Sequence, residues 1–294
     1  MKIFVSGGTG FVGHEVVRQL CEQGHQVRAL IHRANSALGR EVETVRGDSA
    51  VGESLAGALQ GCDAVIHLVG IIREFPAKGI TFAKLHTEST RNMIQAASAQ
   101  GIGRFLQMSA NGARADAVTD YHKTKWAAEE ELRHSNLDWT IFRPSLIFGA
   151  HDQFVNLLAQ LIRRLPLVPV MGDGRYRLQP VSVDDVAAGF VRALEVPDSV
   201  GQTYHCGGPS AYSYDEILDL VGKSLGKSSV KKLHHPLWFM RPLVAVMQSL
   251  PQFPMSSDQL QMLLEGNICD PEPWRKAFNL ELTNFADGIA KYVK

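Results

Sequence analysis

The sequence predicts an α/β protein with a Rossmann-type, doubly wound parallel sheet and a smaller, mainly helical C-terminal domain. Three observations predict it: apolar runs alternate with helical patterns, a glycine-rich turn joins the first such pair, and prolines become frequent after Gly149. We expect residues 1–150 to form a dinucleotide-binding domain, with 179–207 returning to its sheet. Residues 151–178 and 208–294 are then expected to form a small substrate-binding domain.

The composition is that of an ordinary globular protein, with 45% apolar and 20% charged residues. Thirty basic and thirty acidic residues balance, so no net charge favours nucleic acid or an anionic membrane as a partner. The four cysteines form no CxxC pair and the eleven histidines no HExxH motif, so we expect reduced thiols and no metal site. A strand starting at Lys2 leaves no room for a leader peptide, so we expect a cytoplasmic protein, with a peripheral position at the cytoplasmic membrane face as an alternative.

The elements of the first domain can be followed in order. KIFVS, residues 2–6, is a continuous apolar run, as in a strand buried on both faces. From Phe11 to Gly24 apolar residues recur at helical spacing, which predicts the first helix. The same reasoning predicts five further strands, at 25–31, 43–47, 63–70, 104–109 and 139–144. It also predicts three further helices, at 53–61, 82–100 and 121–134.

One apolar stretch of the second domain needs its own interpretation. Residues 237–250 include Arg241 and Pro242 and are too few to span a bilayer. We predict a core helix of the small domain there, with a membrane-surface or partner-binding face as the alternative.

The turn GGTGFVG lies between the first strand and the first helix, which is where a phosphate-binding loop belongs. Gly7 permits a tight turn, Gly10 permits close approach of a pyrophosphate, and Gly13 lets the helix lie close to the sheet. The helix N-terminus offers free N–H groups to the phosphates. We therefore predict a set of loop residues that bind a dinucleotide: Gly7, Thr9, Gly10, Phe11, Val12 and Gly13. The alternative is a glycine turn in a fold that has lost its ligand.

The end of the second strand bears on the choice of cofactor. An acidic residue there would accept a hydrogen bond from the ribose 2′-OH, but ALIHRAN contains none. His32 and Arg33 suit a 2′-phosphate, with Arg28 as a further candidate, so we predict NADP(H), with NAD(H) as the alternative. Asp48, after the third strand, is predicted to meet the adenine edge. The alternatives are solvated basic residues and a turn aspartate.

YHKTK, residues 121–125, carries the second chemical signal. Tyr121 and Lys125 are four residues apart and project from one face of a helix. A nearby ammonium stabilises a phenolate, so the pair is suited to proton transfer, with the pKa of the tyrosine lowered. The alternative is a surface pair, because this spacing is common.

Four segments together resemble a known family: GGTGFVG, YHKTK, FRPSLIFG and QPVSVDDVA. They are similar to the extended or atypical short-chain dehydrogenase/reductases, the NAD-dependent epimerase/dehydratase superfamily, over nearly the whole chain. Within it, HLVG, LHTESTRNM, VMGDGRYRLQPVSVDDVA and FPMSSDQLQMLLEGN most resemble the nucleotide-binding accessory subunit of respiratory complex I and its bacterial relatives. This resemblance implies association with a respiratory or membrane complex.

The resemblance also implies roles for the catalytic residues. Tyr121 would be the acid/base, while Lys125 would bind the nicotinamide ribose and tune Tyr121. Ser109 and Asn111 are two candidates for polarising the substrate oxygen, and His86 stands where many members have Asn.

Further residues are implied to line the nicotinamide site. Leu68, Val69 and Gly70 would lie on one side of it. Pro144, Ser145 and Ile147 would lie on the far side.

Two functions remain open from the sequence. The first is an NADP(H)-dependent oxidoreductase, epimerase or dehydratase acting on a small oxygenated substrate such as a nucleotide sugar. The second is a non-catalytic or weakly catalytic NADPH-binding subunit or assembly factor. We expect Arg143, Arg175 and Arg177 either to meet an anionic substrate group or to form ordinary ion pairs.

Overall fold

The structure is a computed structural model that describes residues 1–32, 38–248, 253 and 255–294. The chain divides into two compact units, which we describe separately. Unit 1 consists of Met1–Pro144, Val183–Cys206 and Pro271–Glu281. Unit 2 consists of Ser145–Ser182, Gly207–Asp270 and Leu282–Lys294.

Unit 1 is built on a parallel sheet, which confirms the Rossmann-type fold expected from the sequence. Among the described residues its seven strands are β1 (Lys2–Ser6), β2 (Gln26–Ile31), β3 (Glu43–Arg46), β4 (Ala64–His67), β5 (Arg104–Met108), β6 (Asp138–Pro144) and β11 (Gln202–Cys206). Their order is β11-β6-β5-β4-β1-β2-β3, so the chain changes direction across the sheet between β1 and β4. Ligands of doubly wound sheets bind at the carboxyl ends of strands beside such a switch point.

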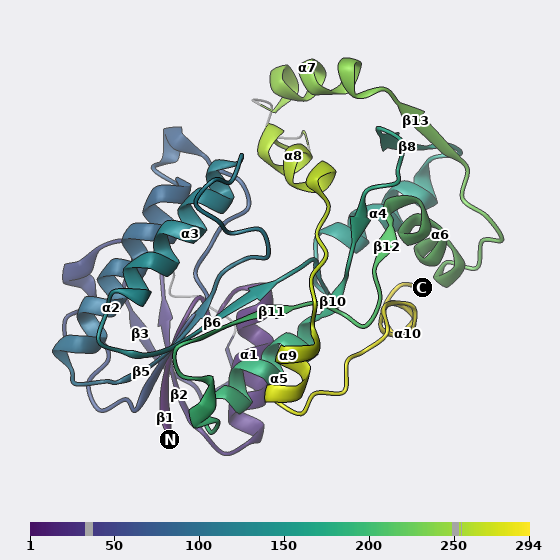
Figure 1. The fold of residues 1–294 in the computed structure, drawn as a ribbon. Coiled ribbons are helices and arrows are strands. Elements are labelled where there is room, and N and C mark those ends of the chain that lie inside the picture. The colour runs from purple at the N-terminus through teal and green to yellow at the C-terminus, as the bar shows by residue number, and fades with distance from the viewer. Residues whose placement is uncertain (33–37, 249–252, 254) are drawn as a thin grey trace. The chain divides into compact units, whose positions relative to one another are not determined.

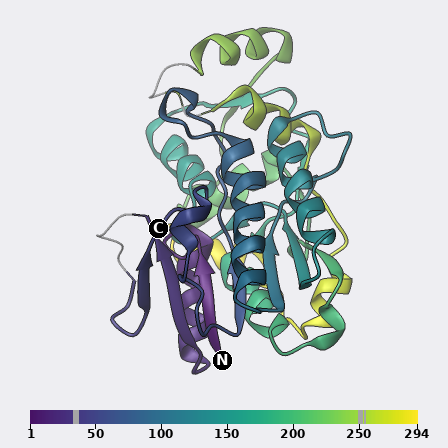
Figure 2. The same ribbon diagram turned by 90° about the vertical axis from the view of Figure 1, so that its left-hand side faces the viewer.

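Helices cover both faces of this sheet. They are α1 (Phe11–Glu22), α2 (Ser89–Ala99), α3 (Asp120–Arg133), α5 (Val183–Ala193) and α9 (Glu272–Ala277), with shorter turns η1 (Gly52–Leu55), η2 (Pro76–Lys78), η3 (Ala83–Glu88) and η4 (Pro197–Ser199). α1 packs beside α5 on one face, and α2 beside α3 on the other (Figure 1, Figure 2). The core between sheet and helices is apolar because the central strands are buried on both faces.

Two predicted helices differ from those observed. The helix expected at 53–61 is only the single turn η1, and Gly57 and Gly61 adopt positive φ angles that end regular helix there. The helix expected at 82–100 begins with the π-helical turn η3 and continues as α2. A π-helical turn widens the helix locally, and such turns are frequent at functional sites.

Residues 271–281 lie in unit 1, whereas the sequence analysis assigned them to the small domain. Trp274 is fully buried against α5, where a Cβ on Gly189 would lie 2.6 Å from its indole nitrogen. The guanidinium of Arg192 donates to the carbonyl oxygen of Phe278 at 2.7 Å. These contacts hold the segment on unit 1.

Unit 2 contains short strands and five helices among its described residues. Its strands pair as β7 (Ile147–Phe148) with β10 (Val181–Ser182), β9 (Arg177–Leu178) with β12 (Tyr212–Ser213), and β8 (Val168–Met171) with β13 (Lys232–His235). Its helices are α4 (Phe154–Arg164), α6 (Tyr214–Ser224), α7 (Leu237–Met247), α8 (Ser257–Glu265) and α10 (Phe285–Ala290). α4, α6 and α10 enclose an apolar core that includes Phe148, Ile217 and Phe285.

The prediction of a core helix at 237–250 is wrong for the described part of that stretch. α7 buries only Met240 and Val244, while several of its large apolar side chains are exposed. No described helix of the chain is long and apolar enough to cross a membrane.

Candidate cofactor and catalytic site

The glycine-rich loop follows β1 and leads directly into α1. Gly7 has a φ of +78°, and a Cβ there would lie 2.9 Å from the carbonyl carbon of Leu68. A Cβ on Gly13 would lie 2.1 Å from the carbonyl oxygen of Gly7, so only glycine fits. The loop therefore lies against the backbone that follows β4, at the switch point of the sheet.

The N-terminus of α1 is suited to an anion. Gly10 is its N-cap residue and has no side chain to cap it, and no acidic residue lies in the first turn. Thr9 and Gly10 are exposed, while Val12 and Gly13 are buried against the sheet. The first backbone N–H groups of a helix lack intrahelical acceptors, so this cradle of glycines fits a pyrophosphate.

The residues expected at the adenosine end lie partly together. Nε2 of His32 is 3.6 Å from a carboxylate oxygen of Asp48, and the other oxygen accepts from the Ala50 N–H at 2.9 Å. Asp48 thus closes its own turn and also faces His32. Arg28 is engaged elsewhere: it donates to the Gln60 carbonyl at 2.7 Å and pairs with Glu43 at 2.8 Å, so it does not join this group. Arg33 lies outside the described residues.

Tyr121 and Lys125 lie on α3, whose N-terminus is capped by the Thr119 side chain. The Lys125 ammonium is buried, with 3% of the residue exposed, and donates to the Met108 carbonyl at 3.1 Å. A Cβ on Gly70 would lie 2.8 Å from the same nitrogen. Lys125 therefore reaches the carboxyl edge of the sheet, between the segments that follow β4 and β5.

The protonation of this pair differs from the sequence-based expectation for Tyr121. Burial raises the pKa of Tyr121 to about 12 and lowers the pKa of Lys125 to about 8. The nearby carboxylate of Glu129 acts in the opposite direction on Lys125, raising its pKa, but less strongly than burial. Desolvation outweighs any stabilisation of a phenolate, so Tyr121 is a neutral phenol at neutral pH.

His86 joins Tyr121 in an aromatic cluster. Its ring stacks on Phe82 at 5.3 Å and meets the Tyr121 ring edge-on at 5.4 Å. Nδ1 lies 3.0 Å from the Thr124 hydroxyl, and Nε2 lies 3.2 Å from the Ile71 amide nitrogen and 3.1 Å from the Ile71 carbonyl oxygen. Burial and the charge of Lys125 lower the pKa of His86 to about 2, so the ring is neutral.

A buried polar chain beneath the site was not anticipated from the sequence. The Ser6 hydroxyl lies 2.6 Å from Nδ1 of His67, whose Nε2 is 3.4 Å from the Ser89 hydroxyl. Ser89 donates in turn to Ser49 at 2.7 Å. Burial lowers the pKa of His67 to about 3. The available signal was a polar residue at the end of each of two apolar strands, Ser6 on β1 and His67 on β4, which are register partners in the sheet.

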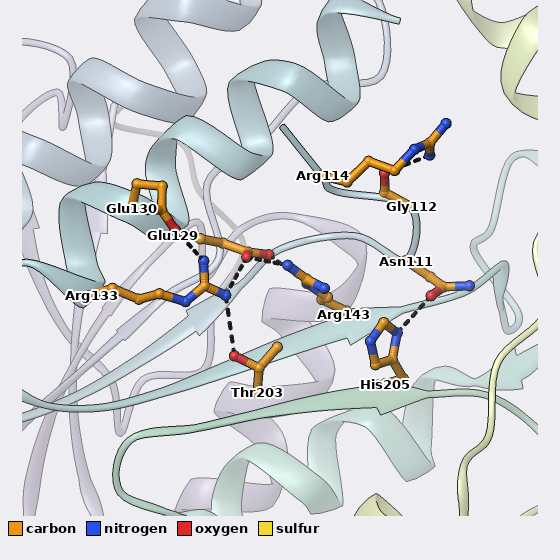
Figure 3. A network of polar contacts seen from close by, with 9 residues as sticks. All are labelled: Asn111, Gly112, Arg114, Glu129, Glu130, Arg133, Arg143, Thr203 and His205. Atoms are coloured by element: carbon orange, nitrogen blue, oxygen red, sulfur yellow. Dashed lines mark hydrogen bonds and ion pairs between the residues drawn. The ribbon is translucent and has the colours of Figure 1, made fainter. Parts of the chain in front are cut away.

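Ser109 and Asn111 follow β5 and differ in their contacts. The Ser109 hydroxyl is buried and has no hydrogen-bond partner among the described residues. Oδ1 of Asn111 lies 2.7 Å from Nδ1 of His205 on β11 (Figure 3). An unpaired buried hydroxyl is costly in a folded protein, so Ser109 is the residue with unused hydrogen-bonding capacity at this edge.

Arg143 takes part in a buried ion-pair network, and not in an open anion site. Its guanidinium binds the fully buried Glu129 carboxylate, which also pairs with Arg133 at 2.7 Å (Figure 3). Both guanidiniums lie over the ring of Trp126, at 4.9 Å for Arg133 and 5.5 Å for Arg143. The network joins α3 to the end of β6, so the ion-pair interpretation of Arg143 is the one observed.

The remaining candidates divide between the two units. Pro144 ends β6 in unit 1, while Ser145 and Ile147 belong to unit 2. The Ser145 hydroxyl donates to the Gln179 carbonyl, and Ile147 lies in β7. In the same unit the Arg177 side chain donates to the Ala211 carbonyl at 2.9 Å. A role for these unit 2 residues at the nicotinamide stays a prediction.

Fold and site together define a dinucleotide-binding α/β protein with a tyrosine–lysine pair at the carboxyl edge of its sheet. Residues 7–197 match the NAD(P)H-binding family, and the chain belongs to this family. The resemblance to the short-chain dehydrogenase/reductases and to the complex I accessory subunit is thereby confirmed.

Two relatives and one solved structure illustrate the similarity. Mitochondrial NADH dehydrogenase (ubiquinone) 1 alpha subcomplex subunit 9 of Arabidopsis thaliana is 29% identical over 74% of this chain and 56% of its own length. Ceramide reductase of Caulobacter vibrioides is 31% identical over 66% of this chain and 61% of its own length. The match thus spans less than two thirds of each relative. UDP-glucose 4-epimerase of Thermotoga maritima shares the fold, with a TM-score of 0.79 at 19% identity, covering 100% of this chain and 97% of that one.

Proposed function

We propose that this protein is an NADP(H)-dependent oxidoreductase in which Tyr121 exchanges a proton with a small oxygenated substrate. The observation that supports it is the position of Lys125. Its buried ammonium lies at the sheet edge between Gly70 and Met108, one helical turn after Tyr121. A buried ammonium is costly, and among the described residues the one hydrogen bond of Lys125 is to the Met108 carbonyl. A ligand that accepts a further hydrogen bond would recover part of the cost.

The protonation states favour the reductive direction. A bound nicotinamide would supply a hydride to the carbonyl carbon of the substrate. Tyr121, a phenol with a pKa of about 12, donates its proton to the carbonyl oxygen as that oxygen gains the electron pair of the broken π bond. The buried Ser109 hydroxyl is available to donate a hydrogen bond to the same oxygen. Hydride and proton together complete a two-electron reduction to an alcohol.

The substrate class follows from the proposed chemistry and from the relatives. A ceramide reductase and a UDP-glucose 4-epimerase are both similar to this chain. We therefore include carbonyl compounds and sugar nucleotides as substrates, with epimerisation or dehydration as variants that begin by the reverse step, hydride removal from a carbinol. In that step the oxidised nicotinamide would take the hydride, and the phenolate of Tyr121 accepts the hydroxyl proton. The raised pKa of Tyr121 makes this phenolate a strong base.

A second function is supported by the relatives that are complex I subunits. In it, the chain holds NADPH and supports a respiratory or membrane assembly from its cytoplasmic side, with little or no turnover. The contact between Asn111 and His205 favours this alternative, because one of the two candidate polarising groups is already engaged.

Removal of one hydroxyl tests the proposal. Tyr121→Phe should leave NADPH affinity within about twofold and lower the rate of NADPH oxidation by at least about 10²-fold, because a positioned acid contributes that much. Affinity is measured by calorimetry, and oxidation by the loss of absorbance of the reduced nicotinamide with a panel of carbonyl compounds and sugar nucleotides. Tyr204→Phe removes a phenolic hydroxyl from β11 and serves as the control.

The two functions give different results in this assay. An unmodified protein that binds NADPH but oxidises it with no substrate of the panel favours the non-catalytic subunit. Failure to bind either NADPH or NADH would remove both functions, whatever the variants do.

A further inference from the structure

Helix α7 exposes an apolar face that the described residues of unit 2 leave uncovered. Trp238 is 78% exposed, Val246 is 73% and Phe239 is 47%. The buried side of the helix consists of Met240 and Val244. Helix α7 lies at the outer edge of unit 2, where α8 is its neighbouring helix (Figure 1).

The exposed residues form one continuous face. At 100° per residue, Trp238, Pro242 and Val246 make one row at i, i+4 and i+8, and Phe239 and Leu243 make the adjacent row. Met240 and Val244 lie on the opposite side of the helix. Large apolar side chains that gather on one exposed face mark a surface that is normally covered by protein or lipid.

The charges around α7 restrict what can cover it. Residues 220–257 contain five basic residues, Lys223, Lys227, Lys231, Lys232 and Arg241, and no aspartate or glutamate. The whole chain has equal numbers of basic and acidic residues, so the remainder of the chain carries the compensating negative charge. Lys232 pairs with Asp219 at 2.7 Å and Lys227 donates to the Ile162 carbonyl, so the exposed Lys231 and Arg241 carry the positive charge beside the apolar face.

A surface that is both apolar and anionic matches this arrangement. A bilayer with acidic headgroups offers a hydrocarbon boundary for Trp238 and Phe239 and negative charge for the lysines. Helix α7 has eleven residues, about 16 Å of helix, which is about half of a bilayer core, so it can lie only in the plane of the surface. Pro242 has no backbone N–H, so it adds no hydrogen-bond donor to this apolar face.

We propose that α7 docks this protein onto an anionic lipid surface, with Trp238, Phe239 and Val246 in the headgroup–acyl boundary and the exposed Lys231 and Arg241 on the headgroups. This proposal stands on unit 2 alone and does not depend on whether the cofactor site turns over a substrate.

Vesicle co-sedimentation tests it. The full chain should bind vesicles of phosphatidylcholine with about 30% phosphatidylglycerol, whose negative charge attracts basic residues, and bind pure phosphatidylcholine at least about tenfold more weakly. Trp238→Ser with Phe239→Ser should lower partitioning by more than about tenfold. Lys231→Gln with Arg241→Gln should lower binding to anionic vesicles by about fivefold for each charge and leave binding to neutral vesicles unchanged. Val118→Ser and Lys291→Gln, exposed positions elsewhere in the chain, are the matched controls.

Tryptophan fluorescence distinguishes insertion of α7 from adsorption by another face. Trp238 is the most exposed of the chain's tryptophans, and anionic vesicles should shift its emission to shorter wavelength. Trp238→Phe should keep vesicle binding and lose the shift. Because the Trp238 side chain is exposed, neither its replacement by Ser nor its replacement by Phe should change the thermal midpoint by more than a few degrees. This measurement separates lost binding from lost folding.

Three results would overturn the proposal. The first is no binding to anionic vesicles. The second is equal binding to neutral and anionic vesicles. The third is concentration-dependent dimerisation that Trp238→Ser abolishes in the absence of vesicle binding, which would assign the face to a second copy of the chain.

Discussion

Nδ1 of His205 lies 2.7 Å from Oδ1 of Asn111, which joins the end of β11 to the segment after β5. Because an amide oxygen only accepts, Nδ1 carries the ring proton. Burial and the charge of Arg143 lower the pKa of His205, so the ring is neutral at neutral pH. Asn111 is therefore held by a structural contact, while the hydroxyl of Ser109 two residues earlier has none among the described residues.

This difference predicts which residue polarises the substrate. Ser109→Ala should lower kcat by about 10²-fold, the usual effect of removing one hydrogen bond to a developing oxyanion. Asn111→Ala should lower kcat by less than about tenfold and the free energy of unfolding by about 1 kcal/mol, because it removes the partner of His205. Steady-state kinetics and urea unfolding measure the two effects. A larger loss of kcat in Asn111→Ala than in Ser109→Ala would reverse the assignment.

The sequence could predict the parts of the site that depend on local pattern. The loop from Gly7 to Gly13 follows from glycine spacing between a strand and a helix, and it lies where the pattern placed it. The shared face of Tyr121 and Lys125 follows from helical periodicity.

What the sequence could not predict depends on contacts between distant segments. The ion pairs of Glu129 with Arg133 and Arg143 and the contact of Trp274 with Gly189 require the packing of α3 on β6 and of α9 on α5. For residues 237–250 the sequence favoured a core helix over an exposed face, because an apolar pattern does not show whether anything covers it. The sequence indicates a lowered pKa for Tyr121 because it shows the nearby Lys125 charge, but it does not show the burial that raises this pKa.

Lys125→Met should stabilise the folded protein and weaken cofactor binding. The buried ammonium has a pKa of about 8, against 10.5 for an ordinary lysine, so its charged form is disfavoured in the folded state. Below pH 8 methionine removes this cost, and we expect a gain of about 1–3 kcal/mol in the free energy of unfolding at pH 7. NADPH affinity should fall by about tenfold or more, since one hydrogen bond from a charged donor is lost.

The pH dependence of that gain has a definite sign. Between pH 8 and 10 the unfolded chain retains the proton on Lys125 while the folded chain loses it, so the stability of the unmodified protein rises with pH. The advantage of Lys125→Met should therefore shrink over this range, where Tyr121 stays protonated in the folded state. Lys123→Met, at an exposed position on the same helix, is the control and should show neither effect. An advantage that grows with pH would contradict the burial of a charged Lys125.

Glu129→Gln should destabilise the protein far more than the loss of an exposed pair. The Glu129 carboxylate is fully buried and binds two guanidiniums, so its removal leaves two poorly hydrated cations close together. We expect a loss of about 3 kcal/mol in the free energy of unfolding. Glu131→Gln, which breaks the exposed pair with Arg91, should cost about 0.5 kcal/mol. Equal losses in the two variants would show that the buried network does not hold α3 to β6.

Cofactor selection can be tested at His32 and Asp48. We expect the unmodified protein to bind NADPH more tightly than NADH, because no acidic residue ends β2 and His32 lies there. His32→Ala should lower NADPH affinity by up to about tenfold and leave NADH affinity unchanged, since only the 2′-phosphate is lost as a partner. Asp48→Asn should raise NADPH affinity. The substitution removes a carboxylate that lies 3.6 Å from the His32 imidazole and would repel the phosphate.

Calorimetric titration with both nucleotides measures these changes, and His25→Ala, just before the start of β2, is the control for loss of an imidazole. Equal or tighter binding of NADH by the unmodified protein would reject the preference, and a fall in NADPH affinity in Asp48→Asn would instead place this carboxylate on the adenosine, where it accepts a hydrogen bond from the nucleotide.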